Sequence, residues 1–188
     1  MSLALRREPR MRFADFLAMI RGRPDEERWE LLDGEPVLMA PPSERHQQIV
    51  MNLGRQLGPL ADRLGCRALP GLGLRNEFVD DFAPIPDLVV RGGPLLADGY
   101  ARDPILVAEV LSPSTMHNDR GRKAAFYQSL QTLRSFLIVY QDEPRVELWL
   151  LGNGPDWTLR ALGLDDTIDL PDLAGSVPVA SLYAGILT

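Results

Sequence analysis

Glu109 is the residue whose setting in the sequence most strongly indicates chemistry. It stands within Leu106–Leu111, where every other side chain is aliphatic. A carboxylate buried in such a run loses its hydration, which costs several kcal/mol unless the group is paired, protonated or bound to a metal. Glu109 is therefore either the partner of one of the many arginines or a functional acid.

Two further acids are candidates to join Glu109. Asp87 follows Pro84-Ile85-Pro86 and opens an apolar run, although an aspartate after proline is also an ordinary strand start. If the runs that carry Asp87 and Glu109 pair as strands, their carboxylates come close together. Oxygen ligands completed by water suit Mg²⁺ or Mn²⁺. Glu30, within Trp29–Leu32, is either a third acid of the site or a solvent-facing residue.

Lys123 is conspicuous because it is the single lysine among 20 basic residues, the other 19 being arginines. It lies 14 residues after Glu109, on the helix expected to leave that strand. Lysine and arginine are not interchangeable where a compact charge is required. Lys123 is therefore a candidate catalytic cation, the alternative being a solvated helix lysine.

The elements that must position these residues follow from the apolar periodicity. Helices are expected over residues 12–21, 44–64 with Ser43 as N-cap, 119–130 with Asn118 or Asp119 as cap, and within 179–187. Strands are expected over 29–39 as a hairpin around Asp33-Gly34, 72–78, 86–91, 105–111, 136–140, 146–151 and 157–162. This order predicts an α/β (α+β) fold in one domain over residues 1–188, with helices packed on a mixed sheet.

Composition excludes several other classes of protein. The chain has 188 residues, is 45% hydrophobic and carries a net charge of -6, which rules out a wholly basic nucleic-acid-binding surface. One cysteine, Cys66, and two histidines cannot build a structural zinc site. No apolar run is long enough for a membrane helix and no signal-peptide core precedes Arg6, so a cytoplasmic protein is expected.

The two histidines allow a site role but do not require one. His46 lies three residues after Ser43, where it could donate a hydrogen bond to a nearby carboxylate or simply occupy the surface. His117 precedes the expected helix that carries Lys123, and the same two interpretations apply to it.

Four stretches of the sequence resemble the PD-(D/E)XK nuclease superfamily, and within it the Uma-two family, described as "putative restriction endonucleases". They are WELLDGEPVLMAPPSERHQQIV (29–50), PDLVV (86–90), AEVLSPST (108–115) and NDRGRKAAFY (118–127). The resemblance spans about residues 28–150 and implies a restriction-endonuclease-like core. The family's usual glycine and aromatic pair after Tyr127 are replaced here by Leu130–Leu137, which affects the neighbouring wall more than the candidate ligands.

The resemblance also implies roles for the candidate residues. Asp87 and Glu109 would bind the metal, Mg or Mn, and Glu30 would be a supporting acid. The superfamily's lysine would stand at position 111, which is Leu111 here, so Lys123 would replace it from the following helix.

These roles predict a metal-dependent endonuclease, with DNA as the expected partner and arginines such as Arg10, Arg12 and Arg122 contacting its backbone. Cutting both strands of a duplex would favour a homodimer. Two alternatives stay open: a catalytically inactive nuclease-fold module that binds nucleic acid or protein, and an α/β protein in which Glu109 is a structural ion-pair partner.

Overall fold

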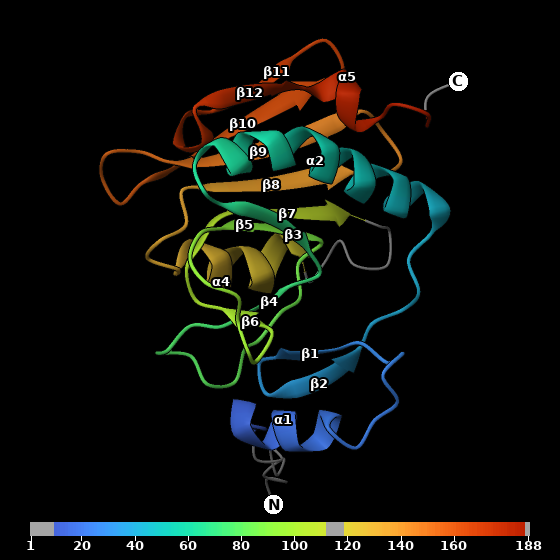
Figure 1. The fold of residues 1–188 in the computed structure, drawn as a ribbon, viewed down its shortest axis with the longest axis vertical. Coiled ribbons are helices and arrows are strands. Elements are labelled where there is room, and N and C mark those ends of the chain that lie inside the picture. The colour runs from blue at the N-terminus through green and yellow to red at the C-terminus, as the bar shows by residue number, and fades with distance from the viewer. Residues whose placement is uncertain (1–9, 112–118, 187–188) are drawn as a thin grey trace, which may run out of the picture.

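A six-stranded mixed sheet forms the centre of the molecule (Figure 1). The structure is a computed structural model and describes residues 10–111 and 119–186. The sheet order is β10-β9-β8-β7-β5-β3, and all neighbours are antiparallel except the parallel pair β7 and β8. The strands are β3 (Arg67–Pro70), β5 (Leu88–Arg91), β7 (Pro104–Leu111), β8 (Ser135–Tyr140), β9 (Arg145–Leu151) and β10 (Trp157–Gly163).

β7 is the central strand that its apolar sequence predicts. Every residue of β7 is buried except Ile105, which is partly buried. A strand covered on both faces needs apolar side chains on both, and this produces the nearly uninterrupted run. Glu109 is the exception in that run, and it lies near the carboxyl end of the strand.

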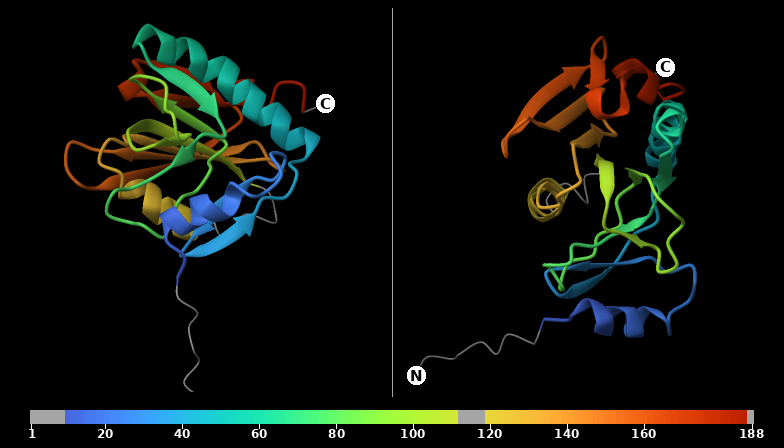
Figure 2. Two further views of the ribbon diagram at one scale, coloured as in Figure 1. Left: turned by 60° about the horizontal axis from the view of Figure 1, so that its bottom comes forward. Right: turned by 60° about the vertical axis from the view of Figure 1, so that its left-hand side comes forward.

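Helices cover both faces of the sheet, as the right-hand view of Figure 2 shows. On one face, α2 (Glu44–Arg63) packs its apolar side over residues such as Leu88 and Ala108. On the other face, a π-helical turn (η1, Asp119–Lys123) leads into α4 (Ala124–Gln128), which packs with Val89 and Val107. The parallel pair β7 and β8 requires a crossover connection, and this helical segment is part of it.

A small N-terminal layer lies below the sheet in Figure 1. It consists of α1 (Phe13–Ile20) and the hairpin β1 (Trp29–Leu32) and β2 (Glu35–Leu38). The hairpin turn has Asp33 and Gly34 at φ 52° and 77°, the left-handed conformation that Asp-Gly favours. Leu31 bridges to Ala83, which ties the hairpin to the segment preceding Asp87.

Most of the expected elements are confirmed, including the Ser43 cap of α2, which accepts a hydrogen bond from the His46 backbone. The strand expected at 72–78 is wrong: the chain forms β3 earlier, then the two-residue β4 (Gly73–Leu74), which pairs in parallel with β6 (Tyr100–Ala101). Three elements that precede α5 (Val179–Leu182) were not predicted from the sequence. They are β11 (Thr167–Leu170), the 3₁₀ turn η2 (Pro171–Leu173) and β12 (Gly175–Pro178).

None of the helices formed by residues 10–111 and 119–186 is both long enough and apolar enough to span a membrane.

Candidate functional site

Asp87 and Glu109 meet on the face of the sheet that α4 covers. The antiparallel register pairs Leu88 with Ala108, and continuing it by one residue sets Asp87, which directly precedes β5, opposite Glu109. Alternation places both side chains on the same face as Val89 and Val107. The Val110 backbone N–H donates to Asp87 Oδ2 at 2.7 Å, which fixes the aspartate against β7.

Lys123 lies between Glu30 and Glu109. Its Nζ is 2.8 Å from Glu30 Oε1 and 3.4 Å from Glu109 Oε1, and the three side chains are only 4–6% exposed. The solvated alternative for Lys123 and the solvent-facing alternative for Glu30 are therefore wrong. Glu109 therefore pairs with this lysine.

Two separate segments, the one before Asp87 and the π-helical turn, hold Glu30 and its hairpin in that position. The Ile85 backbone N–H donates to Glu30 Oε1 at 2.7 Å, so the segment that leads to Asp87 also binds the glutamate of β1. At the tip of the hairpin, Arg122 Nη1 lies 2.8 Å from Asp33 Oδ2. Two consecutive residues of the π-helical turn, Arg122 and Lys123, thus bind the N-terminal hairpin.

Tyr127 brings a hydroxyl to the same carboxylate. Its OH donates to Glu109 Oε1 at 2.5 Å, and the residue is fully buried. Tyr127 lies one helical turn after Lys123, and positions four apart share a face of a helix. Glu109 Oε1 therefore receives both the hydroxyl of Tyr127 and the ammonium of Lys123.

His46 approaches the site from the start of α2. Its Nε2 is 3.3 Å from Asp87 Oδ2, and its side chain is mostly buried. The expected contact with a carboxylate is thus confirmed, while the Ser43 hydroxyl accepts the His46 backbone N–H. His117, Asn118 and residues Ser112–Thr115 of the third motif lie outside the described residues.

A second buried glutamate lies further along the same row of the sheet. Glu109 pairs with Ile138 of β8, and Ile138 pairs with Glu147 of β9, so the two glutamates are about 10 Å apart across two strands. Glu147 Oε1 accepts the Tyr140 hydroxyl at 2.7 Å and lies 3.2 Å from Arg145 Nη2. The sequence predicted neither Glu147 nor Tyr127 as a site residue. For Glu147 the reason is that an acid in an alternating strand indicates a solvent-facing position.

Negative charge dominates the site. Glu30 and Glu109 bring two carboxyl groups to Lys123, and Asp87 adds a third carboxyl group beside His46. The charge of Glu30 also reaches Tyr100: burial, with smaller contributions from Asp98 and Glu30, raises the pKa of that hydroxyl to about 12.

The donor set fits a hard divalent cation. Asp87 and Glu109 offer carboxylate oxygens from opposed backbone positions, and such oxygens are the ligands that Mg²⁺ and Mn²⁺ prefer. In residues 10–111 and 119–186, no three His, Cys, Asp or Glu side chains are grouped closely enough to hold a metal ion by themselves. A cation at this position would take its further ligands from water or substrate.

The arginines expected to contact a nucleic-acid backbone lie in ion pairs around the N-terminal layer. Arg10 pairs with Asp81 at 3.1 Å and Arg12 with Asp80 at 4.0 Å. Both arginines remain well exposed, at 60% and 77%, and their expected contact with a nucleic-acid backbone stays a prediction.

The arrangement has the fold of restriction-endonuclease-like proteins. A crystal structure of a "putative nuclease belonging to DUF820" from Anabaena variabilis superposes with a TM-score of 0.77, covering 94% of this chain and 99% of that one at 16% identity. The resemblance inferred from the four motifs is confirmed by the family model of Uma2, described as "Putative restriction endonuclease", which matches residues 13–180. The chain belongs to the Uma2 family.

Relatives in Synechocystis are similar over most of their length. "Uncharacterized protein slr1290" is 27% identical over 163 residues, which cover 85% of each chain. "Uncharacterized protein sll1609" is 27% identical over 140 residues, covering 72% of this chain and 79% of the relative.

Proposed function

We propose that this protein is a nuclease that hydrolyses phosphodiester bonds, with DNA as its substrate and Mg²⁺ or Mn²⁺ as its cofactor. The carrying observation is the buried group on the α4 face of the sheet, where Lys123 touches Glu109 and Glu30 while Asp87 stands opposite Glu109. Membership of a family described as restriction endonucleases supports the same reaction class.

Asp87 and Glu109 would hold the divalent cation. When bound, such a cation polarises a phosphoryl oxygen and makes a coordinated water more acidic. Both acids are pre-positioned for this task, since the Val110 N–H fixes Asp87 and the Tyr127 hydroxyl fixes Glu109. Preorganised ligands need no rearrangement at the moment of reaction.

Lys123 would orient the attacking water or stabilise the charge that develops on the phosphate. Glu30 holds the Nζ at 2.8 Å and is itself held by the Ile85 N–H, so the lysine has a fixed position. Glu30 thus supports the reaction through Lys123.

Calorimetric titration with Mg²⁺ and Mn²⁺ tests the proposal without knowledge of the cleaved sequence. We expect saturable binding to the wild-type protein and none to Asp87→Asn or Glu109→Gln, because each variant replaces a carboxylate by a neutral amide of nearly the same shape. The same two variants should lose metal-dependent cleavage of DNA.

Glu147→Gln is the matched control, since Glu147 is an equally buried glutamate on the same face of the sheet. It should bind metal like the wild type. Undiminished cleavage by Asp87→Asn or Glu109→Gln would contradict the mechanism. Absence of metal binding by the wild type would favour an inactive nucleic-acid- or protein-binding module.

A further inference from the structure

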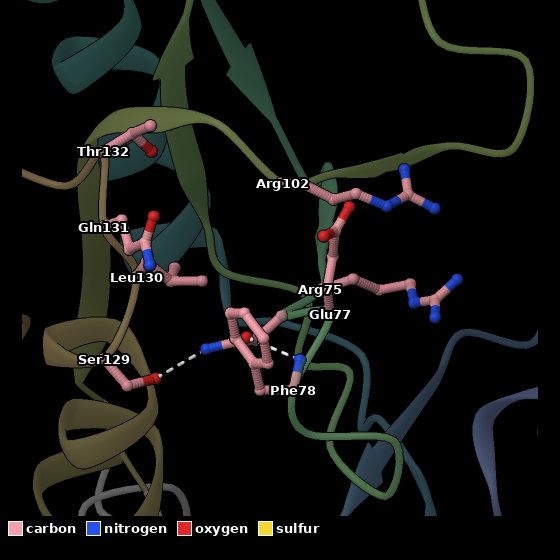
Figure 3. Close-up of a pocket in the computed structure, with 9 residues that line it drawn as sticks. Arg75, Glu77, Phe78, Arg102, Ser129, Leu130, Gln131 and Thr132 are labelled. Atoms are coloured by element: carbon pink, nitrogen blue, oxygen red, sulfur yellow. Dashed lines mark hydrogen bonds between the residues drawn. The ribbon is translucent and has the colours of Figure 1, made fainter.

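An aromatic side chain is held outward on the loop between β4 and β5. Phe78 is 83% exposed, more than any other large apolar side chain in the described residues. The loop beneath it is fixed: the Phe78 N–H donates to Asn76 Oδ1 at 2.9 Å, and Asn76 Nδ2 donates to Ser129 Oγ at 3.0 Å (Figure 3). Asn76 itself is 8% exposed. The exposed ring is thus presented by a rigid support.

Two arginines lie to one side of this ring in Figure 3 because β4 and β6 run in parallel. Arg75 and Arg102 each follow a residue of the register pair Leu74 and Ala101, and so they emerge side by side. The Arg75 guanidinium lies 3.8 Å from the centre of the Phe13 ring, and Arg102 is held by Asp98 at 3.1 Å. In the described part of the chain, Arg75 forms no ion pair with a carboxylate, so its charge is available to an anion.

A cavity of about 150 Å³ opens between these groups. Figure 3 shows Arg75 and Arg102 on one wall and Leu130, Gln131 and Thr132 on the opposite wall. The volume equals that of about five water molecules. Glu77 lines the cavity and Asp98 pairs with Arg102, so Arg75 is the arginine of this lining that forms no ion pair within the described residues.

We propose that Phe78 and Arg75 form a contact site for an unpaired nucleic-acid strand, in which a base stacks on Phe78 and Arg75 binds a phosphate. Exposed aromatic rings beside cations are the means by which proteins bind single strands without sequence preference. A single exposed ring suits an unpaired base, because bases in a duplex are already stacked on each other.

This site lies away from the cleavage residues but on the same helix. Ser129, which anchors the Phe78 loop, directly follows the last residue of α4, and Lys123 directly precedes its first residue. The backbones of Lys123 and Ser129 are therefore separated by about 9 Å along the helix axis. The inference rests on the proposed function, because a strand bound at Phe78 would be the single-stranded substrate of the cleavage site. Its physical test does not depend on cleavage.

Fluorescence anisotropy of a labelled 12-nucleotide oligodeoxythymidine in EDTA measures the contact without metal or cleavage. We expect Phe78→Ala to weaken binding roughly 5- to 150-fold, the range for loss of one stacked base. Phe78→Trp should bind like the wild type, whereas Phe78→Leu should bind like Phe78→Ala. Arg75→Gln should reduce the slope of log K against log salt by about 0.7.

Leu159→Ala is the matched control, because Leu159 is an exposed apolar residue of β10 at the far edge of the sheet. It should leave binding unchanged, and thermal melting confirms that each variant is folded. Equal affinity of Phe78→Ala and the wild type, or no wild-type binding, would overturn the inference. The inference would also be overturned if Phe78→Ala lost as much affinity for a blunt duplex as for the single strand. A change from dimer to monomer caused by Phe78→Ala in sedimentation would overturn it too. None of these results would alter the metal titration that tests the proposed function.

Discussion

Glu109 and Glu147 have the same chemistry but different neighbours. Both are buried on one face of the sheet, and both accept a tyrosine hydroxyl on Oε1. Glu147 lies beside Arg145, whose guanidinium packs over the Tyr140 ring at 4.8 Å. Glu109 instead lies beside Lys123 and opposite a second carboxylate. Glu109 is thus a candidate metal ligand and Glu147 a structural acid, because Asp87 stands opposite Glu109 at the start of the neighbouring strand.

This comparison predicts a specific role for the Tyr127 hydroxyl. Tyr127→Phe keeps the ring packed against Phe126 and Phe136 but removes the donor to Glu109 Oε1. We expect metal affinity and cleavage to fall by roughly 10- to 150-fold, since a hydrogen bond to a charged group contributes roughly 1.5–3 kcal/mol. Calorimetry and a cleavage assay measure the two effects.

Tyr140→Phe is the control, because it removes the equivalent hydroxyl from Glu147. It should lower the free energy of unfolding by a similar amount while leaving metal affinity unchanged. If the two variants behave alike in the titration, Tyr127 contributes only to stability and the positioning role is wrong.

At the scale of elements, the site depends on where three segments cross. β7 carries Glu109, the segment before β5 carries Asp87, and β1 carries Glu30. The π-helical turn that delivers Lys123 is of a rare type that often occurs at functional positions. The short parallel pair β4 and β6 supports the neighbouring loops, and it permits no side chain at Gly73.

Two glycines should respond to alanine in opposite directions. A Cβ at Gly73 would overlap the buried ring of Tyr100, so Gly73→Ala should destabilise the protein by about 1–3 kcal/mol. A Cβ at Gly54 in α2 would meet only Leu88 Cδ1 at 3.9 Å, so Gly54→Ala should stabilise it by about 0.5–1 kcal/mol. Urea unfolding measures both, and a stable Gly73→Ala protein would show that the β4–β6 contact is loose.

At the scale of the whole molecule, the candidate site joins two layers. Glu30 and Asp33 belong to the N-terminal hairpin, and their partners Lys123 and Arg122 belong to the helical crossover on the sheet. The N-terminal layer has its own apolar cluster around Phe16 and Leu31. A cation bound near this junction would therefore stabilise the folded molecule as a whole.

Thermal unfolding should show that coupling. A ligand that binds only the folded state at 100 times its Kd stabilises it by about 2.7 kcal/mol, which raises Tm by roughly 5–10 °C for a chain of this size. We expect this shift with Mn²⁺ for the wild type and for Glu147→Gln, and no shift for Glu109→Gln. The same shift in Glu109→Gln would place the bound cation elsewhere.

The sequence by itself determined the main elements and singled out Glu109 and Lys123 as candidate site residues. Period-two and period-3.6 patterns arise from burial of one face, so they predicted β7, α2 and the Asp33-Gly34 hairpin within a few residues. Glu109 was recognisable because a charge in an apolar strand is costly, and Lys123 because it is the chain's single lysine.

Only the tertiary structure decided which alternatives apply. The burial of Glu30, the contact of His46 with Asp87 and the partners of Glu147 depend on segments distant in sequence, and no local periodicity encodes such distances. Short strands such as β4 and β6 likewise form because other segments hold them together, since two residues carry too little pattern to predict pairing. The same holds for Phe78, whose exposure beside Arg75 and Arg102 follows from how the loops pack.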